Sequence, residues 1–235
     1  MPTLEYFGHS AFRVRDDKHS VFIDPFLTGN PSCPVKPAEL KSCDFILLTH
    51  GHADHFGDAL ELALKHKATI VATWELAQFC GSKGAKVHPM AAGGSHEFPF
   101  GRVKMVPAIH GCGGDPRPDG SVPPPNTPVG LVVQWGAKGQ EKILYHAGDT
   151  ALYSDMKLIS ERFKLDVACL PIGDNFTMGI EDATLAVQWL NPKITVPIHY
   201  NTFDIIKADA QAFAFHLEKS GHKCRALKPG EKMEF

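Results

Sequence analysis

The sequence predicts an α/β fold in which two packed β-sheets are covered by helices on their outer faces. Continuous apolar runs of strand length, such as 45–48 and 69–72, are typical of strands buried on both faces of a sheet. Segments with helical spacing of apolar residues lie between such runs. An order of strands followed by alternating strands and helices occurs twice along the chain, and this repetition indicates two sheets.

The strands can be placed from these apolar runs and the turn residues between them. In the first half we expect strands over 4–7, 11–14, 21–23, 45–48, 69–72, 86–89, 94–98 and 102–108. In the second half we expect strands over 129–135, 142–146, 165–170 and 193–198.

The helices are expected to pack on the outer faces of the sheets. Their predicted ranges are 59–67, 74–79, 180–190 and 208–220. The buried face of the first helix should consist of Leu60, Ala63 and Leu64. The second helix should end at Cys80-Gly81, because glycine commonly follows the last helical turn.

Residues 111–128 are rich in glycine and proline and cannot form a regular element. A loop of this length within a compact domain is usually functional or mobile. The sequence leaves open whether it is a lid over a functional site or a passive excursion.

The composition predicts one globular domain over residues 1–235, with 43% hydrophobic and 21% charged residues. The 24 Lys and Arg residues nearly balance the 26 Asp and Glu residues, so nucleic acid is not expected as a partner. No apolar stretch approaches the roughly 20 residues that span a bilayer, and no signal peptide is evident. The six irregularly spaced cysteines indicate free thiols, so a cytoplasmic protein is expected.

Four ionisable residues follow the predicted strand 45–48 within six positions of the chain: His50, His52, Asp54 and His55. They therefore lie at the carboxyl end of a buried strand, where open α/β sheets bind ligands. Imidazole and carboxylate groups are ligands that zinc, iron and manganese accept. The alternative is a solvated polar loop, but three histidines in six positions are improbable by chance. We therefore predict a metal site.

The same arrangement recurs elsewhere in the chain. His110, Asp149 and His199 each directly follow an apolar run of strand length. Taken singly, each histidine could be a satisfied surface residue, but the recurrence favours metal ligands. Asp24 also ends a strand. As a buried carboxylate it needs a partner, either the free ring nitrogen of a ligand histidine or the strand end that it would cap.

The segment Thr49-His50-Gly51-His52-Ala53-Asp54-His55 resembles the T-H-x-H-x-D-H signature of the metallo-β-lactamase superfamily. The resemblance covers nearly the whole chain. Six further segments are similar to one branch of this superfamily, the small metal-dependent hydrolases akin to ascorbate-6-phosphate lactonase-like proteins: Gly8-His9-Ser10, Ile23-Asp24-Pro25-Phe26, Gly148-Asp149-Thr150, Pro171-Ile172-Gly173, Thr177-Met178-Gly179 and the run from Ile198 to Phe203.

This resemblance implies an αββα sandwich with two divalent cations at one edge. It implies that the first cation is held by His50, His52 and His110, and the second by Asp54, His55 and His199. Asp149 would bridge both. Zinc is the expected metal, with manganese, iron and nickel as alternatives, because the His and Asp preferences of these metals overlap.

The implied activity is hydrolysis of a small ester, lactone or phosphodiester by hydroxide that the cations activate. Asp54 and Asp149 are the expected catalytic carboxylates. His9 is expected near the metals as an extra ligand or proton carrier, with a structural hydrogen-bonding role as the alternative. Tyr200 could contact a substrate oxygen or simply pack.

Three alternatives to ester or lactone hydrolysis remain open. A phosphodiesterase acting on phospholipid-type or nucleotide substrates is the alternative within hydrolases. A di-iron redox protein and a metal-binding protein without turnover are the alternatives of another class. The expected partner is a small-molecule substrate, and the sequence leaves a homo-oligomer open.

Overall fold

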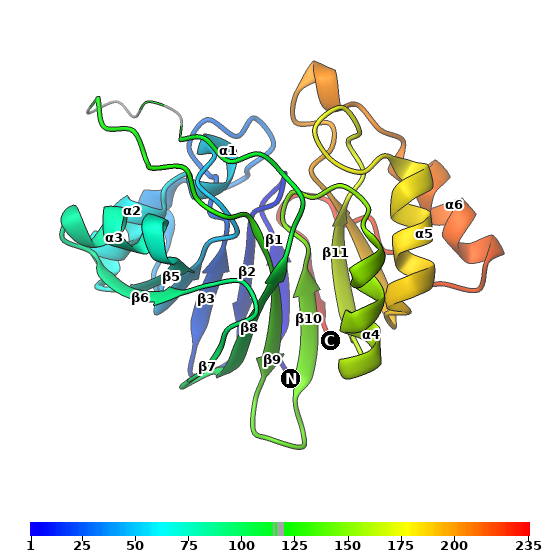
Figure 1. Ribbon diagram of the computed structural model, residues 1–235, viewed down its shortest axis with the longest axis horizontal. Coiled ribbons are helices and arrows are strands. Elements are labelled where there is room, and N and C mark those ends of the chain that lie inside the picture. Colours follow the sequence, from blue (N-terminus) through cyan, green and yellow to red (C-terminus); the bar gives the residue numbers. More distant parts are fainter. Residues whose placement is uncertain (115, 117–119) are drawn as a thin grey trace.

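Two β-sheets pack face to face, with helices on both outer faces, in the computed structural model, which describes residues 1–114, 116 and 120–235 (Figure 1). The first sheet has the strand order β13-β1-β2-β3-β4-β5-β6. Its strands are β1 (Thr3–Tyr6), β2 (Phe12–Arg15), β3 (Ser20–Ile23), β4 (Phe45–Leu47), β5 (Thr69–Thr73), β6 (Lys86–Met90) and β13 (Lys232–Glu234).

The second sheet has the order β12-β11-β10-β9-β8-β7. Its strands are β7 (Ser95–Phe98), β8 (Gly101–Pro107), β9 (Val129–Trp135), β10 (Lys142–His146), β11 (Val167–Pro171) and β12 (Ile194–Ile198). Both sheets are mixed, because β3 to β6 pair in parallel and so do β10 to β12, while the remaining pairs are antiparallel.

The helices divide between the two sheets (Figure 1). The first sheet is covered by α2 (Ala59–His66) and α3 (Trp74–Ser82), and α1 (Ala53–Phe56) precedes them. The second sheet is covered by α4 (Lys157–Arg162), α5 (Ile180–Leu190) and α6 (Ala210–Lys219). Short 3-10 helices occur at η1 (Pro37–Glu39), η2 (Ser154–Met156) and η3 (Asp204–Ile206). The prediction of two mixed sheets flanked by helices is confirmed.

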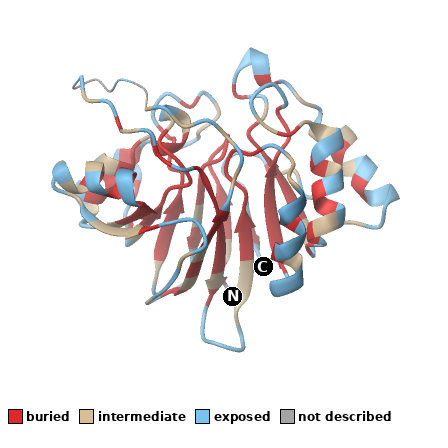
Figure 2. Cartoon of the chain, viewed as in Figure 1, coloured by how far each residue is buried: buried red, intermediate tan, exposed pale blue. Residues whose placement is uncertain are grey.

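The buried side chains form three layers, and Figure 2 shows the strands buried along most of their length. Between the sheets, apolar residues such as Leu47, Val103 and Leu131 are fully buried. The two outer layers lie between each sheet and its helices. Because one face of each helix and both faces of most strands are apolar, this arrangement removes the apolar surface from water.

Three helix predictions need correction. Leu64 is 50% exposed, and the buried face of α2 consists of Ala59, Leu62 and Ala63, which follow the i, i+3, i+4 spacing. Helix α3 continues through Cys80-Gly81 to Ser82. Helix α6 begins two residues later than expected, because the Asp209 side chain accepts hydrogen bonds from the backbone N–H groups of the first turn.

Three short elements were not predicted. Strand β13 has three residues, two of them exposed, and it depends on its antiparallel pairing with β1. The short helices α1 and α4 span four and six residues, which is too few for a clear helical periodicity. Elements of this length are formed by tertiary contacts rather than by local preference.

One direction is shared by the strands that matter for function. Pairing with neighbouring strands shows that β1, β3 and β4 run in one direction within the first sheet and that β8, β10 and β12 run in one direction within the second. The contacts of Asp149 with His55, His110 and His199, which follow strands of both sheets, place these strand ends at the same edge. The loops that follow them therefore meet at this edge, where ligands bind in open α/β sheets. The described part of the loop 111–128 also lies at this edge and contains no helix or strand. Residues 115 and 117–119 of this loop lie outside the described residues, so the choice between a lid and a passive excursion stays open.

Two further expectations concern the cysteines and membrane-spanning helices. All six cysteines are free thiols. Within the described residues, the structure contains no helix that is long and apolar enough to cross a membrane.

Candidate metal centre

Histidine and aspartate side chains gather at the edge where these strands end. The turn after β4 contributes the first of them: His50 is fully buried, and His52 caps the short helix α1, which carries Asp54 and His55. A four-residue helix shortly after the strand turns these side chains back toward the sheet edge. The local sequence thus presents four donors within one compact turn.

The first cluster joins this turn to the loop after β8. His50 Nε2 lies 3.0 Å from His52 Nδ1, and His52 Nδ1 lies 3.3 Å from His110 Nε2. One ring nitrogen from each of the three histidines can be chosen so that all lie within 4.8 Å of one another. Three imidazoles at this spacing could hold one cation.

The second cluster joins the same turn to the loops after β1 and β12. It consists of His9, Asp54, His55 and His199, whose ligand atoms also lie within 4.8 Å of one another. His9 Nε2 and Asp54 Oδ2 are 3.1 Å apart, and His199 Nε2 lies 3.7 Å from the same oxygen. The resemblance implied Asp54, His55 and His199 as ligands of one cation, and His9, which was expected near the metals, lies among them.

Asp149 faces both clusters. Its carboxylate lies 3.6 Å from His110 Nε2, 3.1 Å from His55 Nε2 and 2.9 Å from His199 Nε2. Gly148 makes this turn possible, because its φ of 62° is costly for other residues and a Cβ there would lie 2.8 Å from the Thr49 side chain.

Two atoms of this cluster indicate that the residues fit a cation. His55 Nε2 and Asp149 Oδ1 are both buried, and neither has a hydrogen-bond partner within the described part of the chain. They lie 3.1 Å apart, but not in hydrogen-bonding geometry. Buried polar atoms normally have partners, and imidazole nitrogen and carboxylate oxygen are ligands of zinc and related divalent metals.

A buried carboxylate orients the histidines from behind. Asp24 accepts hydrogen bonds from the Thr49 backbone N–H at 2.8 Å and from the Thr49 hydroxyl at 2.6 Å. It lies 2.7 Å from His55 Nδ1, so the opposite ring nitrogen of His55 faces Asp149. The Thr49 hydroxyl also lies 3.0 Å from His50 Nδ1. One aspartate thereby orients histidines of both clusters.

Burial and neighbouring charges shift the pKa values in opposite directions. Burial lowers the pKa of His50 well below its usual range and lowers that of His9 to about 4. Burial alone would also lower the pKa of His55 and His199, but Asp149 beside them raises the pKa of His55 strongly and that of His199 to about 9. Burial alone would raise the pKa of Asp149, but His55 and His199 hold it well below its usual range.

The backbone at this edge is strained. His9, Asp24 and His199 adopt φ values of 59°, 44° and 53°, in the left-handed region that side chains other than glycine rarely adopt. Such a conformation costs about 1–2 kcal/mol per residue and is concentrated at functional sites. It directs each side chain sideways from its strand end.

His9 is held by a residue that the sequence did not indicate. Its Nδ1 lies 2.9 Å from the Thr202 hydroxyl, while its Nε2 faces Asp54. The backbone N–H of His199 donates to the His9 carbonyl at 2.9 Å, which ties the two loops together. Thr202 follows a ligand candidate by three positions, but only the folded chain brings it to His9.

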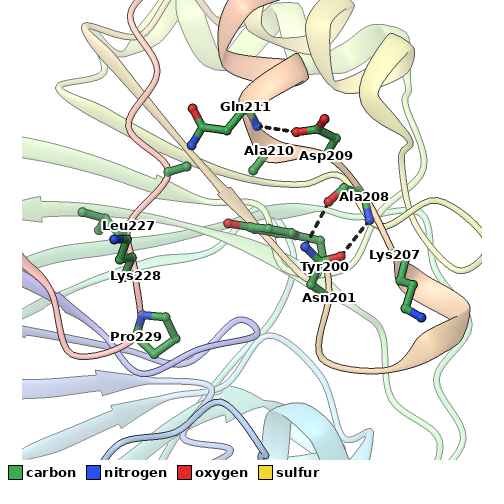
Figure 3. Close-up of a pocket in the computed structure, with 11 residues that line it drawn as sticks. Tyr200, Asn201, Lys207, Ala208, Asp209, Ala210, Gln211, Leu227, Lys228 and Pro229 are labelled. Atoms are coloured by element: carbon green, nitrogen blue, oxygen red, sulfur yellow. Dashed lines mark hydrogen bonds between the residues drawn. The ribbon is translucent and has the colours of Figure 1, made fainter.

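Tyr200 lies away from these clusters. Its ring lines a groove of about 720 Å³ between α6 and residues 226–229, and Figure 3 shows it beside Ala210 and Leu227. Of the two roles that the sequence left open for Tyr200, contact with a substrate oxygen and packing, this placement favours packing. The reason for the placement is the left-handed backbone at His199, which sends these neighbouring side chains in different directions.

The pocket over the clusters has a volume of about 250 Å³. It is lined by His52, Asp54, His110, Asp149, Phe176 and His199. Phe176 was not anticipated, because an isolated aromatic residue in a loop carries no distinguishing pattern. Cys112, two residues after His110, contacts the turn after β4, because its sulfur accepts a hydrogen bond from the Gly51 N–H at 3.3 Å.

Similar proteins are known. Residues 19–200 match the family model described as the beta-lactamase superfamily domain. A UPF0173 metal-dependent hydrolase from Geobacillus sp. (strain WCH70) is 49% identical over 231 residues, covering 98% of this chain and 99% of that protein.

Solved structures give the same result. The structure of Igni18, a metallo hydrolase from the hyperthermophilic archaeon Ignicoccus hospitalis, matches with a TM-score of 0.86 and 36% identity over 100% of this chain and 99% of that one. CmlA, a diiron β-hydroxylase from Streptomyces venezuelae, shares the fold with a TM-score of 0.74 at 15% identity; the match covers 100% of this chain and 54% of CmlA. The chain therefore belongs to the beta-lactamase superfamily and, within it, to the UPF0173 metal-dependent hydrolases.

Proposed function

We propose that the chain hydrolyses a small ester or lactone at a centre of two divalent cations, with phosphodiesters as the alternative substrate. One cation is held by His50, His52 and His110, and the other by Asp54, His55 and His199, with Asp149 between them. The observation that supports this most directly is that two buried potential metal-ligand atoms, His55 Nε2 and Asp149 Oδ1, face one another without a hydrogen-bond partner in the described part of the chain. Zinc is the metal we expect first.

Divalent cations held by these residues would lower the pKa of a bound water and polarise the substrate oxygen. The oxygen of water then bonds to the acyl carbon or phosphorus, the bond to the leaving oxygen breaks, and a proton passes to that oxygen. Asp54 lines the pocket and its side chain is 29% exposed, so its carboxylate can accept a hydrogen bond from the attacking water. His9 orients Asp54 and is itself held by Thr202.

Asp149 and Asp24 have positioning roles in this proposal. Asp149 is 3% exposed and keeps the His55 and His199 rings facing each other across the centre. Asp24 orients His55 from the opposite side. Both carboxylates stay ionised because adjacent histidines lower their pKa values, although burial alone would raise them.

The test combines metal analysis with turnover. Purified protein is loaded separately with zinc, manganese, iron or nickel, and hydrolysis of a lactone panel and of bis(para-nitrophenyl) phosphate is measured. We expect about two cations per chain and turnover of one substrate class. His52→Ala should lose metal and activity together, with Phe215→Ala on α6 as the matched control. A His52→Ala protein with full metal content and full turnover would contradict the assignment, and iron-dependent oxygen uptake without hydrolysis would favour the di-iron redox alternative.

A further inference from the structure

One apolar side chain projects into a pocket that is otherwise built from metal-ligand candidates. Phe176, in the loop between β11 and α5, lines the pocket beside Asp149 and His199, and 54% of it is exposed. Isolated exposed apolar residues are common and need no explanation. The position of Phe176 over a polar centre is therefore informative only if the loop is built to keep it there.

The loop is a tight turn with a specified conformation. Asp174 and Asn175 adopt φ values of 57° and 44°, which aspartate and asparagine tolerate better than other non-glycine residues. The Thr177 N–H donates to the Asp174 carbonyl at 3.0 Å, and the Asp174 N–H donates to the Met178 carbonyl at 3.1 Å. These hydrogen bonds close the turn on both sides of Phe176 and fix the backbone that carries it.

The turn is also tied to the metal centre. The Met178 N–H donates to the carbonyl of Thr150 at 3.1 Å, and the Thr150 hydroxyl accepts from the Ile109 N–H at 3.0 Å. Thr150 directly follows Asp149, and Ile109 directly precedes His110. Thr150 thereby ties the turn that carries Phe176 to the loops that carry Asp149 and His110.

A second exposed aromatic side chain, Phe203, lies beside His9 of the second cluster. Phe203 is 41% exposed, its ring centroid is 5.7 Å from that of His9, and it is 6.4 Å from the ring of Phe26. Ile205, from the same loop, is 59% exposed. Exposed aromatic rings thus lie beside residues of the second cluster on two loops: Phe176 on the loop after β11 and Phe203 on the loop after β12. A substrate group covering them would remove apolar surface from water.

We infer that Phe176 is a specificity-determining residue, and that the substrate carries an alkyl or aryl group next to the bond that is hydrolysed. This inference rests on the proposed function. A purely polar substrate, such as a phosphorylated sugar, would leave the Phe176 ring exposed to water on binding. An apolar substituent would pack on the ring while the scissile group faces Asp149.

The experiment uses pairs of substrates that differ only in the apolar group. The metal-loaded protein is assayed with γ-valerolactone and γ-decalactone, and with methyl and phenyl para-nitrophenyl phosphate. Binding of the two product acids, γ-hydroxyvalerate and γ-hydroxydecanoate, is measured by calorimetry, which requires no turnover. The variants are Phe176→Ala, Phe176→Leu and the control Phe215→Ala, which removes an equally exposed phenylalanine (54%) from α6.

We expect the wild-type protein to prefer the larger member of the active pair by about 10-fold or more in kcat/KM. Phe176→Ala should reduce this preference to about 2-fold, because kcat/KM falls more for the larger substrate than for the smaller one, while Phe176→Leu should retain part of the preference. Phe215→Ala should behave as wild type. An equal loss on both substrates, or no preference in the wild-type protein, would overturn the inference. If no substrate is turned over, the proposed function fails, and the binding of the two product acids decides the inference alone.

Discussion

The two ends of the strands use the same residue, aspartate, in different ways. At the amino ends, Asp166 precedes β11 and accepts hydrogen bonds from the Ile143 N–H at 2.8 Å and from Lys193 Nζ at 2.7 Å. At the carboxyl ends, Asp149 lies among histidines, and one of its buried oxygens has no hydrogen-bond partner within the described part of the chain. The hydrogen-bonding capacity of Asp166 is thus used within the protein, whereas Asp149 has an oxygen that is available to a ligand.

This difference distinguishes an aspartate that stabilises the fold from an aspartate at the candidate metal centre. A satisfied carboxylate at the start of a strand fixes the backbone. A buried carboxylate oxygen without a hydrogen-bond partner is costly unless a cation binds it, because buried polar atoms need partners. The backbone strain at His9, Asp24 and His199 lies at the same functional end. Substitutions of aspartate at the two ends should therefore have different consequences.

The largest effect is expected from Asp149→Asn. This substitution removes a negative charge that faces both clusters, so we expect kcat/KM to fall by more than about 100-fold, beyond the usual cost of losing an outer partner of a metal ligand. Metal content, measured by elemental analysis, should fall as well. An Asp149→Asn protein that keeps its metal and its activity would show that the carboxylate does not act between the clusters.

Asp24→Asn should have a smaller effect on the same measurements. An asparagine can still accept a hydrogen bond from Thr49, but it no longer presents a carboxylate to His55 Nδ1. We expect a loss of about 10- to 100-fold in metal affinity or kcat/KM. A metal titration of the variant checks this, and unchanged affinity would indicate that Asp24 serves only as a strand-end cap.

At the opposite end, Asp166→Ala should affect stability rather than catalysis. The substitution leaves the Ile143 N–H without its carboxylate acceptor, so the free energy of unfolding should fall by about 1–3 kcal/mol. Urea denaturation measures this loss, and kcat/KM of the folded protein should stay within about 2-fold of wild type, since positions remote from a site act independently of it. A large loss of activity would remove the contrast between the two ends.

The smallest effect concerns Asp16, between β2 and β3 at the amino end. Burial alone would raise its pKa, but the N–H groups of Lys18 and His19 and the Trp135 indole donate to the carboxylate and lower the pKa below 3.8. A lowered folded-state pKa means that ionised Asp16 stabilises the protein above the unfolded-state value and that this stabilisation is lost as the pH falls through the folded-state value.

Asp16→Asn should therefore be less stable than wild type at pH 7, by less than about 1 kcal/mol because the group is only partly buried. The difference should shrink below pH 3.8, the ordinary value for this carboxyl. Paired urea denaturation curves at several pH values measure this difference and cancel the titration of the histidine clusters. A difference that grows on acidification would contradict the assigned pKa direction.

The sequence alone was enough to predict every strand except β13, the packing of two sheets and the convergence of their loops. The reason is that apolar runs of strand length report burial directly, and strand direction then decides which loops share an edge. His50, His110, Asp149 and His199 could be singled out because each lies at the end of such a run.

Only the tertiary structure decided how individual side chains are used. The contact between His9 and Thr202 joins residues 193 positions apart, and no local pattern encodes it. The placement of Tyr200 away from the clusters depends on the left-handed backbone at His199. Phe176 enters the pocket because its turn is anchored to Thr150. A side chain's direction at a strand end is set by one or two backbone angles and by contacts with distant segments, and neither is contained in the spacing of residues along the chain.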